Sequence, residues 1–441
     1  WTPDVRIFFT SGNSGLFRFP AQGGLVREDL SPRRGETDFH EISALPGNRG
    51  LFLVLHDSTG YGKIDIWTGD STRVRVLSSP SNLSSPVYAA PGYLVFERFG
   101  DSQGIWAAAF SLETLQITGE PFLVAENGKS PNVAADGTLV YTLGQTNLTA
   151  DLVRVDREGR VTQAFPLADR VVRPFPNLSP DGRYVLHAST DRDSREVYLY
   201  DLETKNRRRL TFNEDLEGMA SFHPNGKEFF FYKEPAWSLY RQDLTSGAAE
   251  ELVVPGGLMA TVTSDGQDLI FARALEEQFA FEIARKRLAD PSQPAEVLVS
   301  TGAIDWWPQV SQDLRYLAYD SNESGHEQVY VTTYPTPGNR WQITREGGMF
   351  PRWRGDGKEL YYTTRDAIYA VEINAEGGFA FSEPRMLFKR PHIDWSSRWA
   401  DGYDVTRDGQ HFYLFAPAGD SEGTQASIVV VHNWAAEYAT P

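Results

Sequence analysis

The chain has 441 residues, about three times the usual domain size, so two or three domains are expected unless the fold grows by repetition. Its 59 acidic and 42 basic residues give a formal charge of −17, which opposes binding to nucleic acid or to an anionic membrane surface. With 41% hydrophobic residues the chain can bury a core, and the lack of cysteine excludes disulfides, thiolate metal sites and cysteine nucleophiles.

Apolar runs in the sequence have the length of strands. Examples are Phe229–Tyr232 and Ile428–Val431, which are far short of the roughly 20 residues that a membrane helix needs. We therefore expect no membrane contact by this segment itself. The first residue is Trp1 rather than Met, which indicates a processed product or a segment of a longer protein.

A turn of the Asp-Gly or Pro-Gly type, followed by a β-rich run, recurs along the chain. The first six turn glycines are 45, 45, 45, 44 and 40 residues apart. The turns are Pro46-Gly47, Pro91-Gly92, Asp136-Gly137, Asp181-Gly182, Asn225-Gly226, Asp265-Gly266, Asp356-Gly357 and Asp408-Gly409, with Asp313-Leu314 in the remaining gap and Trp1–Asp4 as the start of a further copy. The period indicates ten repeat units.

Each unit contains four β-rich segments, best seen in the fifth unit. They are Phe175–Pro180, Tyr184–Ala188, Glu196–Tyr200 and Arg207–Thr211. Asp-Gly between two such segments favours a type I′ hairpin turn, because both central residues need positive φ. The sequence therefore predicts four-stranded antiparallel units.

Such units at a period near 45 are typical of β-propeller blades, whose faces are covered only by neighbouring blades. We expect an all-β fold, a single large β-propeller of about ten units, with eight or nine blades if terminal units merge. A pair of smaller propellers is the structural alternative. The expected units are residues 1–35, 36–85, 86–130, 131–172, 173–216, 217–258, 259–303, 304–348, 349–393 and 394–441.

The turn sequence resembles the TolB-type propeller repeat. Ser179-Pro180-Asp181-Gly182-Arg183 matches that repeat fully, and the segments at 222–227, 262–267, 353–358 and 405–410 match in part. The runs Trp341–Tyr362, Tyr403–Gln410 and Ile428–Trp434 are further similar to the propeller that follows the kinase domain in many bacterial serine/threonine protein kinases.

This resemblance implies the propeller fold and an extracytoplasmic sensing or interaction module, periplasmic or on the cell surface. It assigns no catalytic residue. The kinase motifs themselves are absent from the sequence, as is the Gly-x-Ser-x-Gly nucleophile motif of a serine hydrolase. The eight histidines form neither His-x-x-x-His nor His-Glu-x-x-His, so the sequence contains no local motif for a zinc site.

A ring would bring the inner strands of all blades to one axial channel, where a ligand could bind. The polar and aromatic residues near the inner strands are therefore the candidate ligand-binding residues. They are His40, Glu41, Asn132, Arg173, Asn177, Glu217, Trp307, Gln309, Arg352, Tyr403 and Asp404.

Three functions remain open from the sequence. The first is a non-catalytic propeller that binds a small molecule, glycan or peptide in its channel, or a protein on its top face, as the sensor module of a larger bacterial receptor-type protein. The second is a stand-alone metal-assisted lyase or hydrolase acting on a glycan or lactone. A divalent cation such as calcium could then bind the scattered carboxylates Glu41, Glu217, Asp305 and Asp404. The third is a scaffold without a ligand. We favour the first and predict no cofactor for it.

Overall fold

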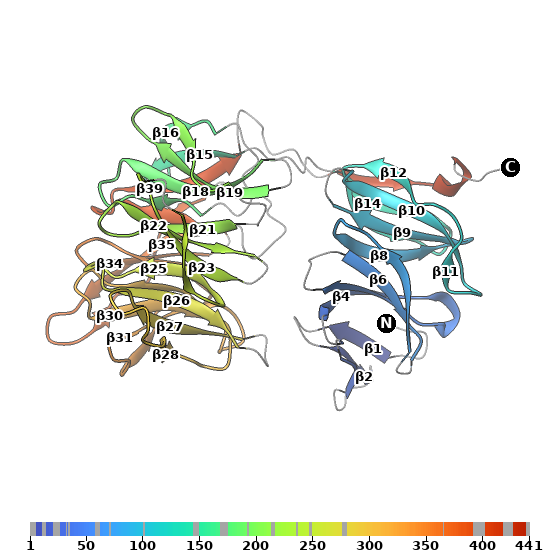
Figure 1. The fold of residues 1–441 in the computed structure, drawn as a ribbon, viewed down its shortest axis with the longest axis horizontal. Coiled ribbons are helices and arrows are strands. Elements are labelled where there is room, and N and C mark those ends of the chain that lie inside the picture. The colour runs from blue at the N-terminus through green and yellow to red at the C-terminus, as the bar shows by residue number, and fades with distance from the viewer. Residues whose placement is uncertain are drawn as a thin grey trace. The chain divides into compact units, whose positions relative to one another are not determined.

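The computed structural model describes the chain except residues 1–5, 11–14, 21–26, 32, 34–35, 58–61, 70–71, 100–101, 144–149, 168–174, 192–193, 213–216, 235–236, 247–248, 276–279, 365, 391–401, 418–426 and 438–441. The chain divides into two compact units (Figure 1). Unit 1 comprises Trp1–Thr146 and Thr424–Pro441, and unit 2 comprises Asn147–Gly423. Within the described residues, no helix has the length and hydrophobicity needed to cross a membrane.

Unit 2 contains six antiparallel sheets among its described residues, and five of them follow one another along the chain. The first is β17–β20 (Asn177–Leu178, Tyr184–Asp191, Ser194–Asp201, Arg207–Arg209). The second is β21–β24 (Glu217–Phe222, Glu228–Lys233, Ser238–Asp243, Glu251–Val254). The third is β25–β28 (Gly257–Val262, Asp268–Ala274, Phe281–Arg287, Glu296–Val299). The fourth is β29–β32 (Asp305–Val310, Tyr316–Ser321, Gln328–Thr333, Arg340–Gln342). The fifth is β33–β37 (Met349–Trp353, Glu359–Thr363, Ala367–Asn374, Ala380–Phe381, Arg385–Lys389).

The sixth sheet closes unit 2 into a ring. It combines β38 (Tyr403–Val405) and β39 (His411–Pro417) from the end of the unit with β15 (Ala150–Asp156) and β16 (Val161–Phe165) from its start, in the order β16-β15-β39-β38. The strand β38 contacts β33 on one side and β17 on the other. Unit 2 is therefore a closed six-bladed β-propeller.

Unit 1 contains four sheets in its described part. They are β1–β3 (Arg6–Thr10, Leu16–Pro20, Arg27–Leu30), β4–β7 (Glu36–Ala44, Leu51–Asp57, Gly62–Trp67, Arg73–Ser78) and β8–β12 (Leu83–Ala89, Tyr93–Arg98, Gly104–Ser111, Gln116–Ile117, Phe122–Glu126). The fourth has the order β13-β14-β40 (Gly128–Val133, Leu139–Leu143, Ser427–Val431). Short 3-10 turns lie at Pro46–Asn48 and Trp434–Glu437.

The expected all-β fold built from about ten repeat sheets is confirmed, because ten sheets are present among the described residues, but these sheets divide between two compact units instead of one ring. Seven expected units each correspond to one sheet. They are the two units between residues 36 and 130 and the five units between residues 173 and 393. The units expected at 131–172 and 394–441 instead exchange strands. In residues 131–172, β13 and β14 belong to unit 1, whereas β15 and β16 belong to unit 2. In residues 394–441, β38 and β39 belong to unit 2, whereas β40 belongs to unit 1. This exchange divides the blades between two units.

A β-bulge interrupts the innermost strand of most sheets. In unit 2 a large apolar residue lies at each of four bulges with positive φ: Met219 (45°), Met259 (54°), Trp307 (52°) and Phe350 (55°). Bulky residues seldom adopt this conformation, so the ring must hold them in place. Equivalent bulges in unit 1 carry Glu41, Ser85 and Ser130, at 52°, 50° and 51°.

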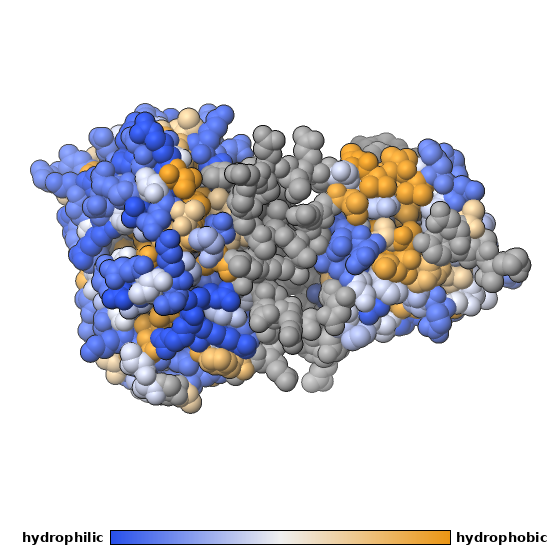
Figure 2. Space-filling model, turned by 90° about the horizontal axis from the view of Figure 1, so that it is seen from above, coloured by the Kyte–Doolittle hydropathy of each residue, from blue (hydrophilic) through white to orange (hydrophobic). Residues whose placement is uncertain are grey.

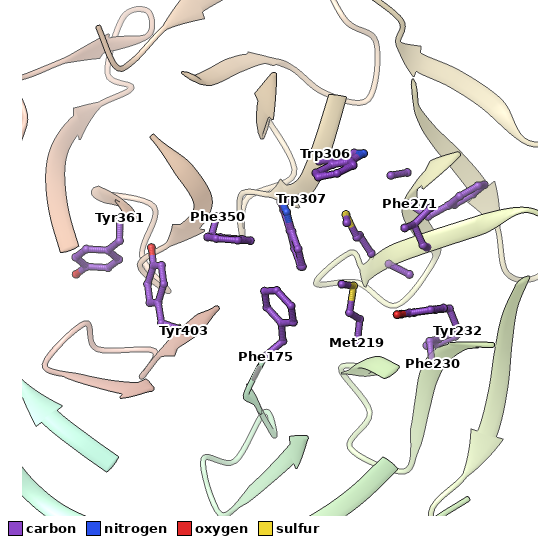
Figure 3. Close-up of a cluster of buried hydrophobic side chains, with 14 of the residues drawn as sticks. Phe175, Met219, Phe230, Tyr232, Phe271, Trp306, Trp307, Phe350, Tyr361 and Tyr403 are labelled. Carbon is purple, nitrogen blue, oxygen red and sulfur yellow. The ribbon is translucent and has the colours of Figure 1, made fainter. Parts of the chain in front are cut away.

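The apolar bulge residues of unit 2 fill the centre of the ring (Figure 3). The ring centroids of Phe175 and Trp307 are 4.5 Å apart, and those of Trp307 and Phe350 are 4.7 Å apart. These side chains come from three different blades, and Met219 and Met259 pack in the same buried cluster. We call these five residues the aromatic plug. Because of it, the axis of unit 2 is closed by side chains rather than open as a water-filled channel.

Candidate ligand-binding site

A polar funnel opens from the aromatic plug toward the hairpin turns of unit 2. Its cavity of about 780 Å³ reaches six blades. A smaller cavity, of about 40 Å³, lies between the funnel wall and the plug and is lined by both. The funnel has the size of a ligand pocket, in the range of a few hundred to a thousand Å³.

Strand alternation explains why the wall of the funnel is polar above an apolar floor. The wall residues follow the plug residues by two positions in their inner strands. The pairs are Phe175 and Asn177, Met259 and Thr261, Trp307 and Gln309, and Phe350 and Arg352.

The structure brings together four of the residues predicted from the sequence, namely Asn177, Gln309, Arg352 and Asp404. The prediction that all eleven converge at one mouth is wrong. His40, Glu41 and Asn132 belong to unit 1. Trp307 forms part of the plug, Tyr403 is 1% exposed in the core, and Glu217 is fully buried with its Oε1 3.6 Å from Lys233 Nζ. Arg173 lies outside the described residues.

Sequence reasoning missed the rim of the funnel. The rim consists of turn residues, among them Ser179, Asp181, Ser264, Gln312, Arg354, Arg407 and Asp408. The signal that could have found them is the repeated Asp-Gly turn itself. Each such turn follows an inner strand, so the turns of a closed ring gather around one mouth.

Asp404 is held by three neighbours in the wall. The backbone N–H of Leu178 donates to its Oδ2 at 2.8 Å, Asn177 Nδ2 lies 3.4 Å from the same atom, and Arg352 Nε lies 3.6 Å from Oδ1. Burial raises the pKa of Asp404 above its usual range, and the Arg352 guanidinium opposes that shift. Asn177 also joins two blades, because its Oδ1 accepts the N–H of Phe222 at 2.8 Å.

Two carboxylates at the rim of the funnel accept hydrogen bonds from neighbouring hydroxyl groups. Asp181 accepts from the Ser179 hydroxyl at 2.5 Å, and Asp408 accepts from the Thr406 hydroxyl at 2.6 Å. Among the described residues, Arg352 donates one hydrogen bond to the carbonyl of Pro351, at 3.0 Å, and its Nε lies 3.6 Å from Asp404 Oδ1. The guanidinium of Arg407 is exposed at the rim and bonds to no described residue. This arrangement suits a ligand that brings negative charge and acceptor oxygens.

The carboxylates considered for a divalent cation are dispersed. Asp305 accepts the Thr301 N–H at 2.9 Å, Glu217 pairs with Lys233, Glu41 accepts the Ser85 N–H, and Asp404 pairs with Arg352. In the part of the chain that the structure describes, His, Asp and Glu do not gather in any group of three that could hold a metal ion.

Comparison with protein-family models and with curated proteins found no match. Among solved structures, a putative TolB from Agrobacterium tumefaciens is 16% identical with a TM-score of 0.46, covering 61% of this chain and 98% of that chain. TolB from Acinetobacter baumannii is 15% identical with a TM-score of 0.37, over 78% of this chain and 80% of that chain. An oligogalacturonate lyase from Vibrio parahaemolyticus is 16% identical with a TM-score of 0.41, over 64% and 75%.

Likenesses at this level of identity and TM-score carry no argument about the site. The six-bladed ring of unit 2 is established by its strand order and its closing sheet.

Proposed function

We propose that unit 2 binds a polar, carboxylate-bearing ligand in its funnel, such as the end of a peptide or a sugar acid, without transforming it. The observation that carries this proposal is the pair of guanidinium groups in the funnel: that of Arg407 bonds to no described residue, and that of Arg352 has a single 3.6 Å contact with Asp404 and one hydrogen bond to the Pro351 carbonyl among the described residues. Arg presents a planar set of N–H donors that matches a carboxylate.

In this proposal the protein is an extracytoplasmic sensor or interaction module of a larger receptor-type protein. A closed ring with a floor of packed aromatic rings offers a preorganised site, which lowers the entropic cost of binding a ligand. The link to a kinase rests on the sequence resemblance of Trp341–Tyr362 and the C-terminal runs.

We expect replacement of Arg352 by glutamine to weaken carboxylate binding about tenfold or more, because a charge-assisted hydrogen bond is lost. Isothermal titration calorimetry with a short peptide carrying a free or an amidated C-terminus, and with glucuronate or glucose, measures this effect. Arg160→Gln is the matched control, since that side chain is 76% exposed outside the funnel.

The wild-type protein should bind the charged member of each probe pair and not the neutral member. Equal binding of charged and neutral probes would contradict the proposal. So would unchanged carboxylate affinity in Arg352→Gln while the variant keeps the wild-type unfolding midpoint.

A further inference from the structure

Each blade of unit 2 has three residues at its inner strand that lead from the axis to the funnel wall. The third of these residues lies four positions before the aspartate or asparagine of the hairpin turn in every blade. In sheet order the triplets are Phe175-Pro176-Asn177, Met219-Ala220-Ser221, Met259-Ala260-Thr261, Trp307-Pro308-Gln309, Phe350-Pro351-Arg352 and Gly402-Tyr403-Asp404. Two adjacent blades thus carry methionine, alanine and a short hydroxyl residue, where three others carry an aromatic residue, proline and an amide or guanidinium side chain.

The small side chains of these two blades border the smaller cavity, of about 40 Å³. Among the described residues its lining includes Met219 and Met259 from the plug, together with Ser221 and Thr261. We call this cavity the methionine pocket. Thr261 and Arg352 line both the methionine pocket and the funnel, so the two spaces adjoin.

The methionine pocket has room for one or two non-hydrogen atoms. A cavity of roughly 150 Å³ holds the six carbons of benzene, so a pocket of about 40 Å³ accepts a group of methyl size. Its floor consists of thioether side chains, which adapt their shape to a small apolar group. By contrast, hydrophilic side chains predominate on the face of unit 2 drawn in Figure 2. A small apolar group of a ligand therefore finds a better contact in the pocket than on that face.

Arg352 connects the methionine pocket with the proposed carboxylate site. Its side chain is 11% exposed and lines both cavities. When a carboxylate pairs with this guanidinium, the substituent on the neighbouring carbon is the ligand group that can enter the pocket. The rest of the ligand then extends into the funnel, where the amide of Gln309 can donate to and accept from a peptide group.

We propose that unit 2 binds the C-terminal end of a peptide whose last residue is alanine, with its carboxylate at Arg352, its methyl group in the methionine pocket and the preceding residues in the funnel. This inference rests on the proposed carboxylate site and selects a peptide end over a sugar acid. In a sugar acid the carbon next to the carboxylate belongs to the ring, and ring atoms exceed the room in the pocket.

The first test compares four acetylated tripeptides with a free C-terminus, acetyl-Gly-Gly-Xaa with Xaa glycine, alanine, leucine or phenylalanine, by isothermal titration calorimetry. We expect the alanine peptide to bind about fourfold more tightly than the glycine peptide, because one further carbon is buried. The leucine and phenylalanine peptides should bind no more tightly than the glycine peptide, since their side chains exceed the pocket.

Two results of this comparison would overturn the inference. One is equal affinity for all four peptides, and the other is an affinity that rises steadily from glycine to phenylalanine. Binding of glucuronate but of none of the peptides would overturn the inference and leave the proposed carboxylate site standing. Binding of no carboxylate at all would overturn both.

The second test changes the pocket itself. Thr261→Gln should reduce the alanine-to-glycine affinity ratio from about four to about one, because the longer side chain fills the pocket. The equivalent position of the next blade already holds Gln309, so the inner strand accommodates this residue. Thr204→Gln is the matched control, since Thr204 is an exposed turn residue that lines neither cavity and should keep the fourfold ratio.

Met259→Ala provides the opposite change and does not depend on the behaviour of Thr261→Gln. It enlarges the pocket, so the tightest binding should move from the alanine peptide to the leucine peptide. An unchanged fourfold ratio in Thr261→Gln at the wild-type unfolding midpoint would overturn the inference. So would a folded Met259→Ala variant that still prefers the alanine peptide by the wild-type factor.

Discussion

Replacement of Gly402 by alanine is expected to destabilise unit 2 by roughly 3 kcal/mol or more. A Cβ on Gly402 would lie 2.0 Å from Cδ1 of Phe175 and 2.9 Å from its Cγ. Phe175 has little room to move away, because Trp307 and Phe350 pack against it at 4.5 and 5.5 Å. Urea unfolding followed by tryptophan fluorescence measures the loss, since Trp307 lies within the plug.

Gly218→Ala is the matched control for this experiment. Gly218 also lies in an inner strand of the ring, but an added Cβ would meet Arg195 and Tyr232 at 3.4 and 3.5 Å, which is ordinary contact. We expect a change in unfolding free energy below about 1 kcal/mol there. In a Phe175→Ala background, Gly402→Ala should lose most of its own effect, because the two changes share one space. Additive losses would contradict the steric explanation.

Acidification is expected to destabilise unit 2 through His187. This side chain is 1% exposed in β18 and stacks on Tyr198, with ring centroids 5.7 Å apart. Burial lowers the pKa of His187 to about 4, from an ordinary value of 6.5. Between these two values the unfolded chain binds a proton that the folded chain does not. Stability therefore falls as the pH drops from 6.5 toward 4, by roughly 3 kcal/mol in total, and does not depend on this group above that range.

Urea midpoints of the wild type and of His187→Phe, measured from pH 7.5 down to 4.5, test this expectation. Phenylalanine keeps an aromatic ring beside Tyr198 and removes the titrating group, so the variant should lose less stability in acid. His326→Gln, at an exposed loop position, should follow the wild type. Parallel pH profiles for His187→Phe and the wild type would show that another group causes the acid sensitivity.

The sequence contained enough information for the blades but not for their division into two units. The spacing of turns such as Asp181-Gly182 and Asp356-Gly357 correctly located the sheets, because a hairpin is a local structure. The exchange of β15 and β40 is not local. Both are apolar third strands that follow a second strand, so either could pair with β14 or β39 by pattern alone. Tertiary packing decides between them.

The candidate site was predictable in part for the same reason. Asn177, Gln309 and Arg352 could be placed near the axis because each precedes the aspartate of its hairpin turn by four residues. The sequence did not predict that side chains close the axis, because this closure depends on contacts between Phe175, Trp307 and Phe350 across the ring. A large apolar residue before proline, as in Trp307-Pro308 and Phe350-Pro351, was the available signal.

The strand exchange also sets an order of events while the chain is being made. Residues 150–156 form β15 near the start of unit 2, but their partner β39 spans residues 411–417. At synthesis rates of about 5 to 20 residues per second, the apolar edge of β15 remains unpaired for tens of seconds before β39 is synthesised. The edge of β14 in unit 1 remains unpaired for a longer time, because its partner β40 follows β39 in the sequence. A nascent chain released or stalled before residue 411 would therefore carry two unpaired strand edges, which are the sites where chains aggregate and where chaperones bind.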